Sequence, residues 1–238
     1  MPERLLILNP GSTSTKAAVY DGTRPLFSRS IPHSNQDFAP FPPLNDQLDY
    51  RVALVRGLLA QERVDLSTLT AVVGRGGILP NIVAGGYQVN DALVDCLLHY
   101  PVFEHASNLG GVMALAFARP LGIPAYIYDA VTSDELLPEA RITGFKGVTR
   151  TSFCHVLNAR ATAHKYAESR GLAYKDMNLV VAHLGGGISI SAHSHGRIID
   201  SVSDDAGPFS PDRSGSTNTL YVVDLCYSGK YTKAEMLK

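Results

Sequence analysis

The sequence predicts an α/β protein of two similar halves, each organised around a strand–turn–strand unit. The first unit is LLILNPGSTSTKAAVY, residues 5–20, and the second is LVVAHLGGGISISA, residues 179–192. Short apolar runs of this kind are typical of buried strands, and segments with helical spacing lie between them. The chain has 238 residues, 45% hydrophobic and 18% charged. That is enough for one large or two small packed domains, and disorder is not expected.

Charge and cysteine usage exclude several classes of function. The formal net charge of −1 gives no basic surface for nucleic acid or an anionic membrane. The three cysteines, Cys96, Cys154 and Cys226, lack C-x-x-C spacing. We therefore expect reduced thiols in a cytoplasmic protein rather than disulfides or a zinc site. No segment is long enough to span a membrane, and the apolar run at residues 5–8 is too short for a signal peptide.

The turn of the first unit carries chemistry suited to phosphate. After the turn residues Asn9, Pro10 and Gly11 come Ser12, Thr13, Ser14, Thr15 and Lys16. Hydroxyls, backbone N–H groups and one ammonium can together hold phosphate oxygens. The pattern is not a Walker A loop, because G-x-x-x-x-G-K-[ST] is absent and no helix clearly follows. The alternative is an ordinary surface hairpin.

The other elements of the first half alternate between strands and helices. Strands are predicted over residues 25–31, 69–73 and 125–128, and helices over residues 46–61, 91–99 and 112–119. Residues 32–45 are rich in Pro, Asn and Asp and are expected to form a loop, as are residues 80–90 in an extended form.

Three polar residues of this half are candidates for binding. Arg75 lies among glycines at a strand end, where it could clamp an anion or simply be a solvated loop residue. Asp129 follows the strand at residues 125–128, at the edge where open α/β sheets bind ligands, although it could also cap a helix. His105, in the segment EHASNLGG, could bind a ligand or could be a loop histidine with a purely local role.

A second unit is expected from about Thr151. A helix is predicted over residues 153–170, with His155 at its start, followed by strands over residues 179–182, 188–192 and 197–202. The Gly185–Gly187 turn would let backbone N–H groups approach a ligand that any Cβ would block. Two such turns facing each other across a cleft would hold a polyphosphate from both sides.

Five motifs resemble those of the butyrate kinases, within the acetate kinase family and the superfamily of actin, sugar kinases and Hsp70. They are LNPGSTSTK, VVGRGG, EHASNLGG, VVAHLGGGISISAH and GPFSPDRSG, and they span nearly the whole chain. Pro10 after Asn9 is similar to the butyrate type, since the acetate type usually has Ala there. The resemblance implies duplicated ribonuclease H-like (actin-like ATPase) domains, with ATP between them. We expect a first domain over residues 1–150 and a second over residues 151–238.

The resemblance also implies roles for individual residues. Catalytic roles fall to Arg75, Asp129, Arg213 and His155, with Arg75 and His105 next to the carboxylate substrate. ATP contacts fall to Asn9, Ser12, Thr13, Ser14, Thr15, Lys16, His183, Gly185, Gly186 and Gly187. Asn9 lies near Mg²⁺. Because family members continue past the position of Lys238, the second domain is expected to be truncated, without the segment that holds adenosine.

The expected reaction is transfer of a phosphoryl group from ATP to butyrate or a similar acid, reversibly. A fatty carboxylate has a pKa of about 4–5 and is ionised at pH 7, so no general base is needed. The obstacle is charge repulsion, which arginines, histidines and Mg²⁺ relieve. Within the enzyme class, the alternative substrate is acetate or a branched short acid. From other functional classes, the alternatives are an Hsp70-like ATP-driven binding module and an inactive remnant that only binds a partner. We expect a homo-oligomer with no nucleic-acid or membrane partner.

Overall fold

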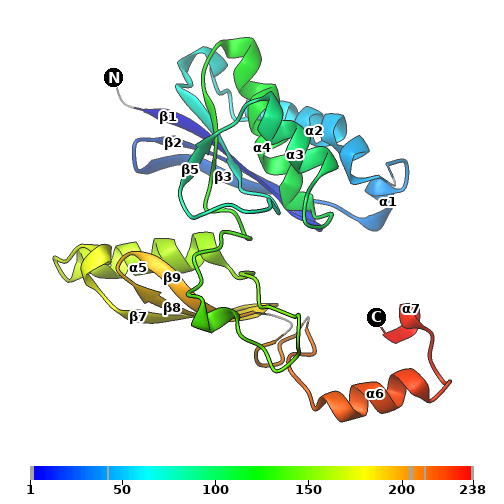
Figure 1. The fold of residues 1–238 in the computed structure, drawn as a ribbon. Coiled ribbons are helices and arrows are strands. Elements are labelled where there is room, and N and C mark those ends of the chain that lie inside the picture. Colours follow the sequence, from blue (N-terminus) through cyan, green and yellow to red (C-terminus); the bar gives the residue numbers. More distant parts are fainter. Residues whose placement is uncertain (1–2, 42, 204–205, 212, 237–238) are drawn as a thin grey trace.

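The computed structural model describes residues 3–41, 43–203, 206–211 and 213–236. The described chain forms two units, one around a six-stranded sheet and one around a three-stranded sheet (Figure 1). The strands of the first sheet are β1 (Arg4–Pro10), β2 (Ser14–Asp21), β3 (Arg24–Pro32), β4 (Ala71–Arg75), β5 (Gly86–Gln88) and β6 (Ala125–Tyr128). They lie side by side in the order β3-β2-β1-β4-β6-β5.

The topology of this sheet brings the candidate residues to one edge. Strands β1 and β2 are antiparallel, with Asn9 opposite Lys16. Strands β1, β4 and β6 are parallel to one another. Their carboxyl ends therefore meet at the same edge, as in other open sheets that bind ligands there. The turn after β1, Arg75 at the end of β4 and Asp129 after β6 all lie at this edge.

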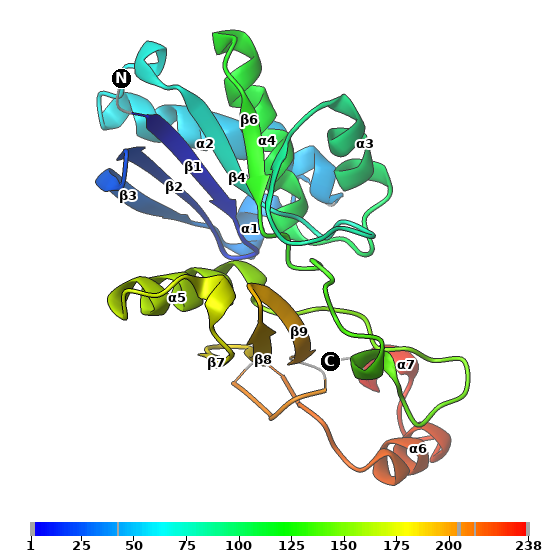
Figure 2. The same ribbon diagram turned by 60° about the vertical axis from the view of Figure 1, so that its left-hand side comes forward.

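Three helices cover one face of the first sheet (Figures 1 and 2). They are α2 (Gln47–Gln61), α3 (Asp91–His99) and α4 (Leu109–Ala118). Met113 and Phe117 of α4 join Leu6 and Leu8 of β1 in one continuous buried core. Helix α4 is apolar on nearly all sides because it is packed between the sheet and the outer helices.

The structure differs from the sequence prediction mainly in segments expected to be loops. Residues 32–45 contain the short helix α1 (Asn35–Phe38) and the start of a 3₁₀ turn (Leu44–Asp46). Residues 80–90 contain β5, which pairs antiparallel with β6. Strand β4 begins two residues later than expected and continues through Arg75. An edge strand of three residues depends on its partner rather than on a local pattern, so the sequence did not indicate it.

The second unit is smaller. Helix α5 (Val156–Ser169) packs on the antiparallel sheet β7 (Leu179–Leu184), β8 (Ile188–Ser194) and β9 (Arg197–Val202). In both views α5 lies on the side of this sheet that faces the first unit. Helices α6 (Thr219–Tyr227) and α7 (Lys233–Met236) extend away from both units (Figure 1). Helix α6 contains no buried residue.

The connection between the units follows the second sheet. Leu137 N donates to Ile199 O at 3.0 Å, and Arg150 pairs with Asp200 at 2.8 Å. We therefore propose that the boundary lies near residue 130 rather than at residue 150. Within the described part of the chain, no helix is both long and apolar enough to cross a membrane.

Candidate active site

Arg75 is held by close backbone packing at the end of β4. A Cβ on the preceding Gly74 would lie 2.0 Å from the carbonyl oxygen of Gly110 in α4. A Cβ on the following Gly76 would lie 2.6 Å from Cα of Ala130. These glycines thus allow the strand to touch its neighbours, rather than exposing peptide groups to a ligand. Burial lowers the pKa of Arg75, whose guanidinium is left at the sheet edge.

His105 lies close enough to Arg75 and Arg213 for both charges to act on it. Its Nδ1 accepts a hydrogen bond from Ser107 N at 3.2 Å and lies 2.7 Å from Ser107 Oγ. This leaves Nε2 as the ring atom that can donate to a ligand. Burial, followed by the charges of Arg75 and Arg213, lowers the pKa of His105. We call Arg75, His105 and Arg213 the basic cluster, in which two guanidinium cations flank a histidine that favours its neutral form.

Arg213 reaches the cluster from a loop of the second unit. Its backbone forms two hydrogen bonds with Ser210, at 2.9 and 3.3 Å. Ser210 Oγ donates to Gly186 O at 2.6 Å. The glycine turn and the Arg213 loop are therefore joined, which was not evident from their separation in sequence.

His155 and His183 form a stacked pair. Their ring centroids are 3.8 Å apart with an interplanar angle of 6°. His155 Nδ1 lies 2.9 Å from Ser189 Oγ, and Asn158 Nδ2 lies 2.8 Å from His183 Nδ1. Ser189 and Asn158 thereby orient the two rings. Sequence reasoning missed both, although the i, i+3 spacing of His155 and Asn158 on a helix was available as a signal.

The glycine turn of the second unit is open to ligands. Gly185 and Gly186 are exposed, and Gly185 N donates to Gly187 O at 3.1 Å. A Cβ on Gly185 would lie 3.1 Å from His183 Nε2. A glycine at this position therefore leaves room for the stacked histidine ring as well as for a ligand.

The hairpin turn of the first unit also presents polar groups, with one exception. Ser12, Thr13 and Lys16 are exposed, and Asn9 and Ser14 are half-buried. Thr15 is fully buried, and its Oγ1 accepts from Arg51 Nη1 at 2.7 Å and lies 2.8 Å from His33 Nε2. Successive strand residues face opposite sides, so Thr15 points toward the helices while its neighbours do not. The Thr15 hydroxyl is therefore already bonded within the core, and its predicted ATP contact stays a prediction.

Asp129 is held at the junction of the two units. It is 3% exposed, and its Oδ1 accepts from Gly85 N at 2.8 Å. Its Oδ2 accepts from Arg160 Nε at 3.1 Å, and Arg160 Nη1 donates to Gly196 O at 2.8 Å. Burial raises the pKa of Asp129, while Arg160 and the Gly85 hydrogen bond act in the opposite direction. The carboxylate thus joins the two units, and its predicted catalytic role stays a prediction.

A cavity of about 420 Å³ opens beside the basic cluster. Val102, Phe103 and Phe153 form the apolar part of its lining, and the polar part comes from Thr132, Thr151, Ser152, Ser203 and Arg213. The rings of Phe103 and Phe153 meet edge to face with centroids 5.5 Å apart. A second cavity of about 520 Å³ shares one wall with the first, formed by Val102, Thr132, Thr151 and Ser152.

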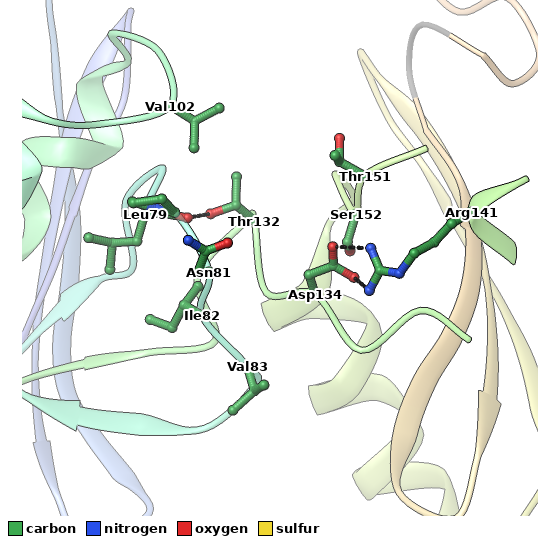
Figure 3. A pocket seen from close by; sticks show the side chains of 11 residues that line it. Leu79, Asn81, Ile82, Val83, Val102, Thr132, Asp134, Arg141, Thr151 and Ser152 are labelled. Atoms are coloured by element: carbon green, nitrogen blue, oxygen red, sulfur yellow. Dashed lines mark hydrogen bonds and ion pairs between the residues drawn. The ribbon is translucent and has the colours of Figure 1, made fainter. Parts of the chain in front are cut away.

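Figure 3 shows that second cavity between the two units. Val102 and Thr132 lie on the side of the first unit, and Thr151 and Ser152 lie opposite them. The cavity extends to Arg141, which forms two hydrogen bonds of 2.7 Å with Asp134. The two cavities thus adjoin, with Arg213 in the lining of the first and the Asp134–Arg141 ion pair in the lining of the second.

Comparison with known proteins assigns the family. The chain is 43% identical over 237 residues to butyrate kinase 1 of Clostridium acetobutylicum, and 40% identical over 238 residues to a probable butyrate kinase of Clostridium botulinum (strain Alaska E43 / Type E3). Each alignment covers 99% of this chain and 67% of the relative. The chain belongs to the butyrate kinase family. It spans about two thirds of the length of these relatives.

Solved structures show the fold of this butyrate kinase family member. An acetate kinase of Porphyromonas gingivalis matches with a TM-score of 0.74 at 18% identity, over 99% of this chain and 66% of that one. A propionate kinase from Francisella tularensis matches with a TM-score of 0.69 at 16% identity, and the match covers 99% of this chain and 67% of that one. The fold is therefore that of the acetate kinases, the actin-like ATPase type predicted from the motifs. A scan against protein-family models found no match.

Proposed function

We propose that the chain carries out ATP-dependent phosphorylation of a short-chain fatty carboxylate, with butyrate as the substrate, and that the reverse reaction makes ATP. The observation that carries this proposal is the basic cluster beside a cavity whose wall includes Val102, Phe103 and Phe153. Arg213 lines the cavity, and its charge and that of Arg75 both act on His105. A carboxylate with a short apolar chain matches this combination of cations and apolar wall.

The reaction requires charge neutralisation rather than proton transfer. A carboxylate oxygen bonds to the γ-phosphorus of ATP while the bond from that phosphorus to the bridging oxygen breaks, and ADP leaves with the electron pair. Both reactants are anions, so positioned cations lower the barrier. Arg75 and Arg213 can each bind a carboxylate or phosphate through two N–H groups, which a lysine cannot. His105 Nε2 can add a donor without adding a charge.

The nucleotide phosphates are proposed to lie between the two polar turns. Ser12, Thr13 and Lys16 would hold them from the first unit. The second unit would hold the phosphates through the open backbone of the glycine turn and through the stacked pair of His155 and His183. The Ser210–Gly186 hydrogen bond supports this arrangement, because it links the glycine turn to the loop that carries Arg213.

Mg²⁺ fits this site as an ion carried mainly by the nucleotide. Among the described residues, no group of three His, Cys, Asp or Glu side chains could hold a metal ion. Asp129 is committed to Arg160, which leaves Asn9 as the nearest predicted oxygen ligand. Mg²⁺ commonly takes one or two protein ligands, with substrate phosphates and water completing the octahedron. When bound, it would neutralise phosphate charge.

The apolar part of the cavity wall supports a preference for four-carbon acids. Each buried CH₂ contributes about 0.8 kcal/mol, so two more methylenes than acetate correspond to a preference of roughly 10-fold or more. Phe103 and Phe153 would contact the hydrocarbon part of the acid. Acetate, propionate, butyrate and isobutyrate can be compared through kcat/KM for acyl phosphate formation, trapped with hydroxylamine. A clear preference for acetate would assign the sister activity, and no acyl phosphate with any acid would refute the proposal.

We also infer a cytoplasmic homo-oligomer. The three cysteines are sparse and lack C-x-x-C spacing, which is typical of proteins from a reducing compartment. Val180 and Leu184 of β7 are each 75% exposed, and the side chains of α6 are also exposed. Apolar surface of this extent favours association between copies.

A further inference from the structure

Arg51 is a buried cation that the reaction proposed above does not use. Its side chain extends from α2, and the residue is 1% exposed. Nε and Nη2 donate to Gln47 Oε1 at 3.2 and 3.0 Å, and Nη1 donates to Thr15 Oγ1 at 2.7 Å. The ring of Phe38 covers the guanidinium at 4.6 Å. All of these partners are neutral.

No carboxylate among the described residues lies within ion-pair distance of Arg51. The ion pairs of the first unit instead use Arg4, Arg29 and Arg119. A buried charge without a counter-charge costs several kcal/mol, even where neutral groups accept its hydrogen bonds. The guanidinium also has five N–H donors, of which three are used in the contacts above. Arg51 therefore has both charge and hydrogen-bonding capacity for an anion.

A cavity of about 280 Å³ lies against Arg51. Its polar lining comes from Ser12, Gln47, Arg51, Glu104 and His105, and its apolar lining from Phe38, Leu44 and Ala106. Ser12 belongs to the hairpin turn and His105 to the basic cluster, so the cavity adjoins the candidate active site from the α2 side. Its volume suits an ion of phosphate size or a short carboxylate.

We propose that this cavity is a binding site for a small oxyanion, phosphate or a short carboxylate, held by the Arg51 guanidinium with Ser12 and His105 at its entrance. The proposal shares Ser12 and His105 with the function proposed above, whereas Arg51 has no part in that reaction. A bound oxyanion would contact both the hairpin turn and the basic cluster. Occupancy of the cavity would then restrain the two segments that receive ATP and the carboxylate.

Glu104 is the competing explanation, because its carboxylate also lines the cavity. Glu104 is exposed, and its movement toward Arg51 could satisfy the buried charge from within the chain. The two explanations make opposite predictions for Glu104→Gln. Removing a repelling carboxylate strengthens binding of an external anion, whereas removing an internal partner destabilises the chain.

The test is isothermal titration of orthophosphate, and separately of butyrate, into the chain carrying Arg75→Ala to weaken the reaction site. We expect saturable binding at one site, weakened at least 10-fold by adding Arg51→Lys, which keeps the charge but loses the fork of N–H donors. Glu104→Gln should strengthen it several-fold. The affinities for orthophosphate and butyrate are then compared, and the ion that binds more tightly identifies the site as one for phosphate or for a short carboxylate.

Arg56→Lys is the matched control, since Arg56 is an exposed arginine of the same helix and should leave anion binding within about 2-fold. The proposal is overturned if anions do not bind saturably in the Arg75→Ala chain, or if Arg56→Lys and Arg51→Lys weaken binding equally. It is also overturned if Glu104→Gln lowers the unfolding midpoint without changing anion affinity. Glu104→Gln decides the question even if Arg51→Lys does not fold.

Discussion

The two units differ in how firmly they hold their share of the candidate site. In the first unit a six-stranded sheet and its helices enclose one continuous core, and Arg75 and His105 are fixed by backbone packing and a hydrogen-bonded cap. In the second unit two separate clusters hold three buried residues each. Arg213 there lies exposed on a loop. One half of the site is thus preorganised, and the other is held by few contacts.

The largest expected effect contrasts the two arginines of the basic cluster. Removing one preorganised charge-stabilising donor costs about 10²–10³ in kcat, and Arg75→Ala should lose that much in kcat/KM for acyl phosphate formation. The loss in kcat/KM for Arg213→Ala should be about 10-fold smaller than the loss for Arg75→Ala, because solvent screens an exposed charge. Arg75→Lys should recover little activity. Near-normal kcat/KM in Arg75→Ala would remove this residue from the site.

The next effect concerns the ion pair that joins the units. Asp129→Asn leaves the Arg160 guanidinium, 12% exposed, with only the more distant Glu135 at 3.9 Å as a charged partner, and should cost about 3 kcal/mol of unfolding free energy. Asp134→Asn is the matched control, because the Asp134–Arg141 pair has side chains 23% and 35% exposed. The control should cost about 1 kcal/mol or less. Urea unfolding of both variants measures the contrast, and equal losses would contradict a special role for the junction.

A third effect is acid sensitivity of the second unit. His193 is 2% exposed between Tyr174 and Ser191, and burial lowers its pKa to about 4. Between pH 6.5 and pH 4 the unfolded chain therefore binds a proton that the folded chain does not. Stability should fall by about 3 kcal/mol as the pH decreases through that window, and be fully regained above pH 6.5.

Hydrogen exchange between pH 4 and pH 7 can locate that loss. After correction for intrinsic rates, amides of β8 should lose protection at low pH more than amides of β1. His193→Asn should flatten the pH dependence in β8. An unchanged slope in His193→Asn would show that another group causes the acid sensitivity.

The smallest expected effect concerns association. Val180→Thr with Leu184→Gln replaces two residues of β7 that are each 75% exposed, so the free energy of unfolding should change by less than about 0.5 kcal/mol. Sedimentation velocity should nevertheless show weaker self-association than in the parent chain. Leu26→Gln, at an exposed position of β3 in the first unit, is the control. An equal effect from the control would argue against the second unit as the associating surface.

The local sequence determined most of the elements and the polar turns of this protein. Apolar runs and helical spacing predicted β1, β2, β3, β6, α2 and α3 to within a few residues, because those signals are carried by adjacent positions. The motifs also indicated the family and most residues of the candidate site. Arg75, His105 and Arg213 were all singled out before their proximity was known.

Only the tertiary structure decided which partners the candidate side chains have within the protein. Thr15 looked like its hydroxyl neighbours, yet it bonds to Arg51, 36 residues away, inside the core. Asp129 occupied a typical ligand position, yet it bonds to Arg160, 31 residues away, across the junction. Stacking of His155 on His183 likewise required α5 to lie beside β7. Such pairings depend on how sheets and helices pack over long separations, and local periodicity and turn chemistry do not encode that packing.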